Sequence, residues 1–353
     1  MFEVALDRFG DGTVLMFAGA AVGLLFGAAA QHSRFCLRAA TVEVAHHTFG
    51  PRLSIWLIAF STAVFAVQGA IALGLLDVKD ARQLAATGSL SGAIIGGLMF
   101  GAGMICARGC ASRLLVLSAT GNLRALTTGL VLTLVAQASL RGALAPARET
   151  LAGLWLIDGG EARDMLNILP FSNASVAGLA ALSLAAAVVL ARRTKVKRTH
   201  ILAAVGVGAA IMLGWGLTYA ISQASFDVVA VSSVTFTGPS TDTLMGLVNA
   251  PELPLGFGVG LVPGVFVGSA LMALATKEAR IERFGADTPM EWYLAGAALM
   301  GFGSMLAGGC AVGAGMSGGS IFSLTAWVAV FCMWIGAMIA SRLQSGAHSV
   351  QTA

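Results

Sequence analysis

Long stretches without a charged residue constrain this chain more than any other feature of its sequence. One covers residues 12–31, and another runs without charge from residue 292 to residue 341. About 20 apolar residues are enough for a helix to cross the hydrocarbon layer of a membrane. Hydrophobic residues make up 57% of the chain and charged residues only 11%, which leaves more apolar surface than a water-exposed fold can bury. The sequence therefore predicts an all-α, polytopic integral membrane protein whose solvent is the lipid bilayer.

Further apolar runs place the other expected crossings. Together with the first two stretches they predict about nine transmembrane helices plus re-entrant or broken helices. These runs are residues 53–76, 88–107, 125–144, 165–191, 201–226 and 253–276. Glycine is dense before residue 108 and again at residues 308–319, which favours breaks in the helices at both places.

A basic segment divides the chain into two parts. Residues 192–200 hold its strongest cluster of Lys and Arg, and such loops usually face the cytoplasm. We predict a single membrane transport domain over residues 1–353, with two pseudo-symmetric halves. The first half-repeat is residues 1–191, the connecting loop residues 192–200 and the second half-repeat residues 201–353. The net charge of +4 is small and sits in short loops, so we expect no nucleic-acid partner.

One short pattern occurs twice, 200 positions apart: Gly-x-Gly, five further residues, then Gly-Cys-Ala. The copies at residues 101–111 and 301–311 place Cys110 and Cys310 at matching points. If a helix resumes after each Gly-Cys pair, its first N–H groups point into the break at the positive end of a helix dipole. Such groups can replace part of the water around an anion, and a thiol adds a weak, polarizable donor. The pattern predicts an anion pathway that contains sulfur.

The candidate pathway residues extend beyond this pair. Arg34 and Arg38 flank Cys36. Arg108 and Arg113 bracket the Gly-Cys pair at Cys110; an arginine at membrane depth usually faces a cavity or a partner, and the alternative is that both lie at the membrane interface. The full set is Cys36, Cys106, Arg108, Gly109, Cys110, Gly309 and Cys310. Five cysteines in apolar surroundings do not indicate a secreted disulfide framework, and their spacing does not match a zinc site. We expect neither a metal nor a cofactor, and we interpret Cys332 as a packing residue.

With these residues in view, the chain resembles the YeeE/YedE family of bacterial sulfur-transport membrane proteins over about residues 14–339. The resemblance rests on Phe35-Cys36, on the Gly-Cys pairs at Cys110 and Cys310, and on Ser-x-x-Phe-Thr-Gly-Pro-Ser-x-Asp-Thr at residues 233–243. It implies a multi-pass importer of thiosulfate in the bacterial inner membrane, with inverted, hourglass-like halves. It also implies that Cys110 and Cys310 form the constriction, that Cys36 is a third thiol, and that a separate cytoplasmic TusA-like sulfur carrier can be a partner.

Two other classes of protein are compatible with the residues. A membrane thiol-redox enzyme could pair Cys110 with Cys106 or Cys310, but it would need a resolving thiol and usually a flavin or quinone site. A metal-thiolate importer could use Met104, Met305 or Met316 near the breaks. Transport of another sulfur or selenium compound also stays open. We expect a transporter and not an enzyme.

Overall fold

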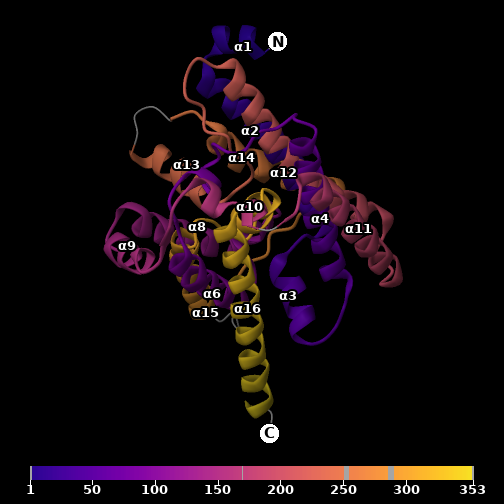
Figure 1. Ribbon diagram of the computed structural model, residues 1–353. Helices are drawn as coiled ribbons and strands as arrows, with labels where there is room; N and C mark the ends of the chain where they lie inside the picture. Colours follow the sequence, from indigo (N-terminus) through magenta and orange to yellow (C-terminus); the bar gives the residue numbers. More distant parts are fainter. Residues whose placement is uncertain (1, 169, 250–253, 285–289, 352–353) are drawn as a thin grey trace.

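The computed structural model describes residues 2–168, 170–249, 254–284 and 290–351, which form a bundle of helices with the two chain ends at opposite ends of the molecule (Figure 1). The long helices are α2 (Asp11–Ser33), α4 (Pro51–Ala72), α6 (Leu90–Cys106), α8 (Leu123–Arg141), α11 (Asn173–Arg193), α12 (Arg198–Ala224), α14 (Phe257–Ala275), α15 (Met290–Leu306) and α16 (Leu324–Gln351).

Shorter elements connect the long helices. The α-helices among them are α1 (Phe2–Phe9), α3 (Leu37–Ala45), α5 (Arg82–Ala85), α7 (Ala111–Ala119), α9 (Ala145–Gly153), α10 (Met165–Ile168) and α13 (Thr237–Asn249). A 3₁₀-helix, η1, covers Gly160–Arg163, and a π-helix, η2, covers Gly313–Gly318. Strands β1 (Gly88–Ser89) and β2 (Leu156–Ile157) form one short antiparallel pair.

The helical content confirms the prediction of an all-α, polytopic membrane protein. Eight helical segments of the described chain are long and apolar enough to cross a membrane, and α15 adds 17 residues of similar character. The crossing predicted from residue 165 starts later, at Asn173. It starts there because the side chain of Ser172 accepts a hydrogen bond from the Ser175 N–H and so caps α11.

Three of the long helices, α2, α6 and α15, end in the same way just before a cysteine. A residue with left-handed backbone ends each one, and the N–H of the next residue bonds the carbonyl five positions back. The left-handed residues are Arg34 (φ 55°), Arg108 (φ 54°) and Gly308 (φ 78°). The hydrogen bonds run from Phe35 to Ala30 (3.1 Å), from Gly109 to Met104 (3.1 Å) and from Gly309 to Ser304 (2.9 Å). This geometry satisfies the last carbonyls of the helix and stops it. The next residue in each turn is a cysteine: Cys36, Cys110 or Cys310.

Glycine allows the long helices to approach closely. Three glycines of α2 lie against the backbone of α14: Gly19, Gly23 and Gly27. In turn, three glycines of α14 lie against the backbone of α2: Gly260, Gly264 and Gly268. A Cβ built on Gly260 would come 1.8 Å from the carbonyl oxygen of Met16. Small residues four apart are typical of such contacts between membrane helices. The α2–α14 pair therefore depends on glycine from both sides.

Two pairs of helices from different parts of the chain run antiparallel. His32 near the end of α2 lies against His200 at the start of α12, with 5.2 Å between ring centroids, whereas Asp11 at the start of α2 accepts a hydrogen bond from Ser225 just after α12. Helices α6 and α15 are also antiparallel. Gly92 near the start of α6 lies beside Leu306 at the end of α15, and Gly103 near the end of α6 lies beside Gly296 in the first half of α15.

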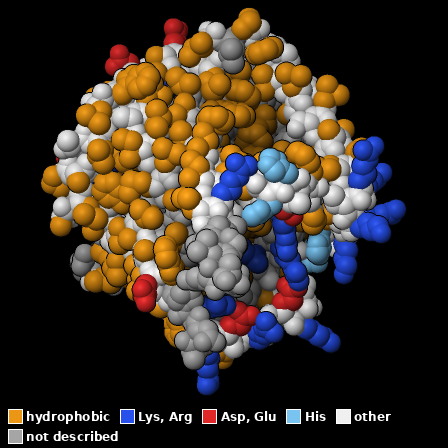
Figure 2. All heavy atoms as spheres, turned by 90° about the horizontal axis from the view of Figure 1, so that it is seen from below, with side chains coloured by type: hydrophobic (Ala, Val, Ile, Leu, Met, Phe, Trp, Pro, Cys, Tyr) orange, Lys and Arg blue, Asp and Glu red, His pale blue; other side chains and the backbone are white. Residues whose placement is uncertain are grey.

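The charges are distributed unequally between the two ends of the bundle. Most Lys and Arg residues lie at the end where α2, α6 and α14 finish and where α4, α8 and α12 begin. Figure 2 views this end and shows Lys, Arg and His side chains gathered next to a broad hydrophobic area. Acidic residues predominate at the opposite end, among them Asp11, Asp77, Asp80 and Asp227. This end-to-end asymmetry is the usual signature of an oriented membrane protein.

Gly260→Ala tests the contact between α2 and α14. Alanine favours an isolated helix over glycine by about 1 kcal/mol, but the new methyl group meets backbone, so we expect a net loss of about 1–3 kcal/mol of stability. The matched control is Gly178→Ala in α11, where a new Cβ meets nothing within 4 Å. Thermal denaturation in detergent, followed by fluorescence-detected size exclusion, should show a lower midpoint for Gly260→Ala only. Equal midpoints in the two variants would contradict the close contact.

Candidate functional site

A basic cavity of about 590 Å³ opens at the Lys- and Arg-rich end of the bundle. It lies beneath the turns that end α2 and α6. Its lining includes Gln31, Arg34, Cys36, Arg38, Arg52, Arg108, Arg113, Lys277, Glu278 and Arg280. So many cations around one hollow attract a small anion from solution, because the surrounding protein focuses their field.

Cys36 lines this cavity, and its buried thiol lies close enough to the buried thiol of Cys110 for the two to interact. Each is the N-cap residue of the short helix that follows its turn, Cys36 for α3 and Cys110 for α7. Neither side chain caps its helix by a hydrogen bond. Cys110 is 1% exposed and lies 3.4 Å from the hydroxyl of Ser112. The first N–H groups of α3 and α7 and two thiols thus meet at one place, which suits weak binding of an anion.

Two arginines bring positive charge close to this pair of thiols. Arg113 is near enough to Cys36 and Cys110 to interact electrostatically with both, and Arg38 interacts with Cys36. The Nε of Arg38 is buried and has no hydrogen-bond partner among the described residues. A buried donor without a partner is costly, so this guanidinium is free to bind an anion that enters the cavity.

A polar chain connects these groups to the rim of the cavity. Arg113 donates to Gln31 (Nη1···Oε1 3.5 Å), Gln31 donates to Glu278 (3.0 Å), and Arg34 donates to the other carboxylate oxygen of Glu278 (2.8 Å). The hydrogen bond from Arg34 holds the pKa of the Glu278 carboxyl below its ordinary value. Glu278 therefore stays ionised near neutral pH and offsets part of the positive charge, because protonation would need a pH below that lowered pKa.

Cys310 lies in the third turn, apart from the basic cavity. Its thiol is 1% exposed and accepts a hydrogen bond from the N–H of Gly313 (3.5 Å) at the start of η2. The Cα of Gly313 faces the Thr235 side chain, and Ser317 of η2 donates to the carbonyl of Val234 (2.6 Å). The start of the segment that carries the Ser-x-x-Phe-Thr-Gly-Pro-Ser pattern, residues 233–243, therefore supports this turn. The structure brings Cys36 and Cys110 together, whereas Cys310 neither lines the basic cavity nor is among the groups that interact with these two thiols.

A second cavity of about 300 Å³ borders the Cys310 turn and lies at the end of the bundle away from the basic cavity. Gly308 and Gly313 line it together with Arg82 and Arg163. Arg163 is 7% exposed, donates to Thr325 (2.6 Å) and to the carbonyl of Ala86, and keeps its Nε without a partner among the described residues. Burial lowers the pKa of Arg163. We call this hollow the outer cavity; sequence reasoning missed Arg163 because it sits in a polar connection with no repeated motif.

The other predicted residues have simpler surroundings. Cys106 is half-buried at the end of α6, one turn before Cys110. The Arg108 guanidinium lines the basic cavity and lies over the ring of Tyr293, 5.9 Å from its centroid. Gly109 and Gly309 each donate the hydrogen bond that closes their turn. Cys332 is buried in α16 beside Gly97 of α6, as expected of a packing residue.

Comparison with known proteins shows which family the chain matches. A family model described as Sulphur transport matches residues 32–339. The chain is 27% identical over 346 residues to the thiosulfate transporter TsuA of Escherichia coli strain K12, an alignment that covers 93% of this chain and 94% of that protein. It is 25% identical over 347 residues to the thiosulfate transporter TsuA of Spirochaeta thermophila, covering 91% of this chain and 97% of that protein.

Oxidative crosslinking tests the contact between Cys36 and Cys110. Copper phenanthroline removes two electrons and two protons from adjacent thiols and should join this pair. Trypsin then releases residues 35–38 and residues 109–113 as one disulfide-linked species, because an arginine precedes and ends each peptide. Peptide mass mapping without reductant should detect it, and Cys110→Ser should abolish it. A disulfide between Cys36 and Cys310, with none between Cys36 and Cys110, would contradict this arrangement.

Proposed function

Because this chain belongs to the sulphur transport family, we propose that it imports thiosulfate across the bacterial inner membrane. The observation that carries this proposal is the pair of contacting thiols, Cys36 and Cys110, at the inner end of a cavity lined with arginine. The protein acts as a transporter and not as an enzyme, and the described residues need only bind and release the ion.

The chemistry of the site suits a small dianion with a sulfur end. Such an ion crosses hydrocarbon only if protein groups replace its water, because the desolvation cost is otherwise prohibitive. The guanidinium groups of Arg38 and Arg113 supply charge for the oxygens. The thiols of Cys36 and Cys110 supply weak, polarizable contacts for the sulfur. Weak contacts in series favour passage, since a tightly bound ion would not leave.

The pathway that we propose begins in the outer cavity. The ion meets Arg163 there, passes the turn that holds Cys310, reaches Cys36 and Cys110, and leaves through the basic cavity. This order uses all three cysteines that follow a left-handed turn, and it requires no covalent bond to sulfur. A separate cytoplasmic TusA-like sulfur carrier would collect the ion at the mouth of the basic cavity.

The two halves proposed from the sequence give this pathway its form. We take residues 1–191 and residues 201–353 as half-repeats of one membrane domain, joined by residues 192–200 and inverted with respect to each other. The antiparallel packing of α2 with α12 and of α6 with α15 supports the inversion, since these helices hold corresponding places in the two halves. Inversion explains why one Gly-Cys turn borders the basic cavity and the other borders the outer cavity.

The charge asymmetry supports an orientation. The end rich in Lys and Arg should face the cytoplasm, which directs the outer cavity toward the periplasm and makes the basic cavity the exit.

Uptake of thiosulfate tests the function and the site together. A bacterium that lacks its own importers should grow on thiosulfate as sole sulfur source when it expresses this chain. Cys110→Ala and Cys36→Ala should lower initial uptake of labelled thiosulfate about tenfold or more, because the ion loses a hydrogen-bond donor where water cannot replace it. The control Cys332→Ala removes a buried thiol of α16 and should keep near-normal uptake. Full uptake in both pathway variants would contradict the role of the thiols. No uptake by wild-type protein present in the membrane would contradict thiosulfate as the substrate.

Reporter fusions test the orientation. Alkaline phosphatase inserted after Lys79 should be active, because the loop after α4 should lie in the periplasm. The same enzyme inserted after Lys195 should be inactive, since the basic loop before α12 should lie in the cytoplasm. Green fluorescent protein at the same two positions should give the opposite pattern. Activity of both phosphatase fusions would contradict the orientation.

A further inference from the structure

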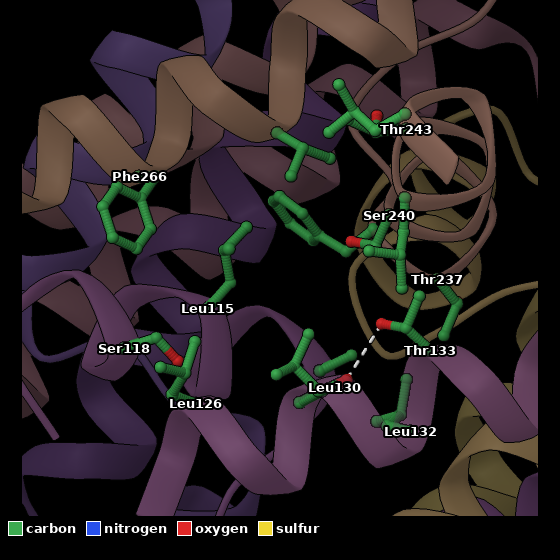
Figure 3. Close-up of a pocket in the computed structure, with 16 residues that line it drawn as sticks. Leu115, Ser118, Leu126, Leu130, Leu132, Thr133, Thr237, Ser240, Thr243 and Phe266 are labelled. Atoms are coloured by element: carbon green, nitrogen blue, oxygen red, sulfur yellow. Dashed lines mark hydrogen bonds between the residues drawn. The ribbon is translucent and has the colours of Figure 1, made fainter. Parts of the chain in front are cut away.

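A mostly apolar pocket of about 220 Å³ lies on the side of the bundle, between α7, α8, α13 and α14 (Figure 3). We call it the seam pocket. Leu115 of α7, Leu126 and Leu130 of α8 and Phe266 of α14 project into one space (Figure 3). Leu126, Leu130 and Phe266 are also exposed on the outer surface of membrane-crossing helices. The pocket therefore opens toward the hydrocarbon of the membrane.

A second hollow of about 520 Å³ lies against three of the same helices, α8, α13 and α14. The seam pocket uses α8 from Leu126 to Thr133, and the second hollow uses Gln137 and Arg141 at the end of that helix. Helix α14 shows the same separation of the two hollows. The second hollow lies at the start of α14, and the seam pocket lies further along it, at Val262 and Phe266. From Leu126 to Arg141 the groove extends on the order of 22 Å at 1.5 Å per residue, which is about the length of an acyl chain with its ester group.

The chemical character changes along this groove. The seam pocket is almost entirely apolar, whereas the hollow beyond it holds a cation, Arg141, and an anion, Asp242. Both residues are exposed, and no ion pair joins them within the described chain. The hollow also lies at the end of the bundle where α8 finishes and α14 begins, which is membrane-interface depth. An occupant must be apolar at one end and must carry both charges at the other.

Two buried hydroxyls of the seam pocket have no partner within the described chain. The Oγ1 atoms of Thr237 and Thr243 are buried without a hydrogen-bond partner among the described residues, and Thr237 is 1% exposed. Both residues line the seam pocket, together with Ser240 (Figure 3). Leaving a buried hydroxyl unpaired costs about 1–3 kcal/mol, so these groups point to a ligand that accepts hydrogen bonds.

We propose that this groove binds one phospholipid with a zwitterionic headgroup. Its phosphate lies at Arg141 and its ammonium group at Asp242. One acyl chain fills the seam pocket, and the ester carbonyls accept hydrogen bonds from Thr237 and Thr243. The proposal adds a ligand to the protein and does not depend on which anion the protein transports.

The position of the acyl chain in the seam pocket gives this lipid a structural role. Helix α7 begins immediately after Cys110, and its residues Ala111 and Leu115 form one wall of the seam pocket. Phe236 lines the same pocket and follows Thr235, which lies beside Gly313 of the Cys310 turn. The acyl chain thus lies directly behind the elements that hold two of the pathway thiols, where an empty space would leave α7 without support on that side.

Gly129→Leu tests the seam pocket by filling it. Gly129 lines the pocket, and a Cβ at this position meets only the Cβ of Leu114 at 3.9 Å, so a leucine can point into the space. Leucine also favours helix over glycine, which protects folding. The matched control is Gly178→Leu in α11, at an exposed glycine with nothing within 4 Å.

Native mass spectrometry of detergent-solubilised, delipidated protein measures the binding. With dioleoylphosphatidylethanolamine the wild type and Gly178→Leu should each retain one lipid, and Gly129→Leu should lose at least tenfold in occupancy. Dioleoylphosphatidylglycerol, which lacks the ammonium group, should bind wild type several-fold more weakly, and Asp242→Asn should abolish this preference.

Equal retention by Gly129→Leu and Gly178→Leu would overturn the pocket assignment. Equal binding of the two lipids by wild type would overturn the headgroup assignment. A wild-type dimer that Gly129→Leu converts to monomer would overturn the proposal in favour of an interface between two copies of the chain. Because the readout is bound mass, failure of thiosulfate uptake would leave these results unaffected.

Discussion

The structure depends on ending helices inside a membrane without leaving backbone groups unpaired. Lipid offers no hydrogen bonds to backbone, so a broken helix must satisfy its own carbonyls. The turns at Arg34, Arg108 and Gly308 do so by one repeated geometry. Two of these positions hold arginine and not glycine, and left-handed backbone costs a non-glycine residue roughly 1–2 kcal/mol. Both arginine side chains line the basic cavity, so the same two positions also supply positive charge to the site.

Close helix packing keeps these turns in register. The carbonyl of each helix end and the N–H groups of the following short helix are fixed only if the long helices cannot slide past one another. Reciprocal glycines provide this constraint between α2 and α14, and Gly96 faces Gly303 between α6 and α15 in the same reciprocal way. A bulkier residue at any such point would separate backbones and displace the adjoining turn. The glycines of these close contacts therefore serve the site as well as the fold.

Much of this architecture could be predicted from the sequence, but one central contact could not. The repeated Gly-Cys pattern predicted the breaks at Cys110 and Cys310, since glycine density and a sudden polar residue are local signals. The contact between Cys36 and Cys110 joins segments 74 residues apart, and no local pattern specifies which of three thiols will meet. A weaker signal was present: Arg34-Phe35-Cys36 and Arg108-Gly109-Cys110 share Arg-x-Cys. Arg163 gave no signal, because its burial arises only when η1 packs against α5 and the start of α16.

The basic cavity must attract an anion and still let it go. Unopposed, the arginines of the lining would hold a dianion strongly, because Coulomb attraction grows as water is excluded. Glu278 opposes them: it pairs with Arg34 at the rim and, through Gln31, reaches Arg113 in the interior. Since its lowered pKa keeps this carboxylate charged near neutral pH, it offsets part of the positive charge of the lining. In the pathway that we propose, this partial offset weakens the attraction between the cavity and a bound anion, which favours release over retention.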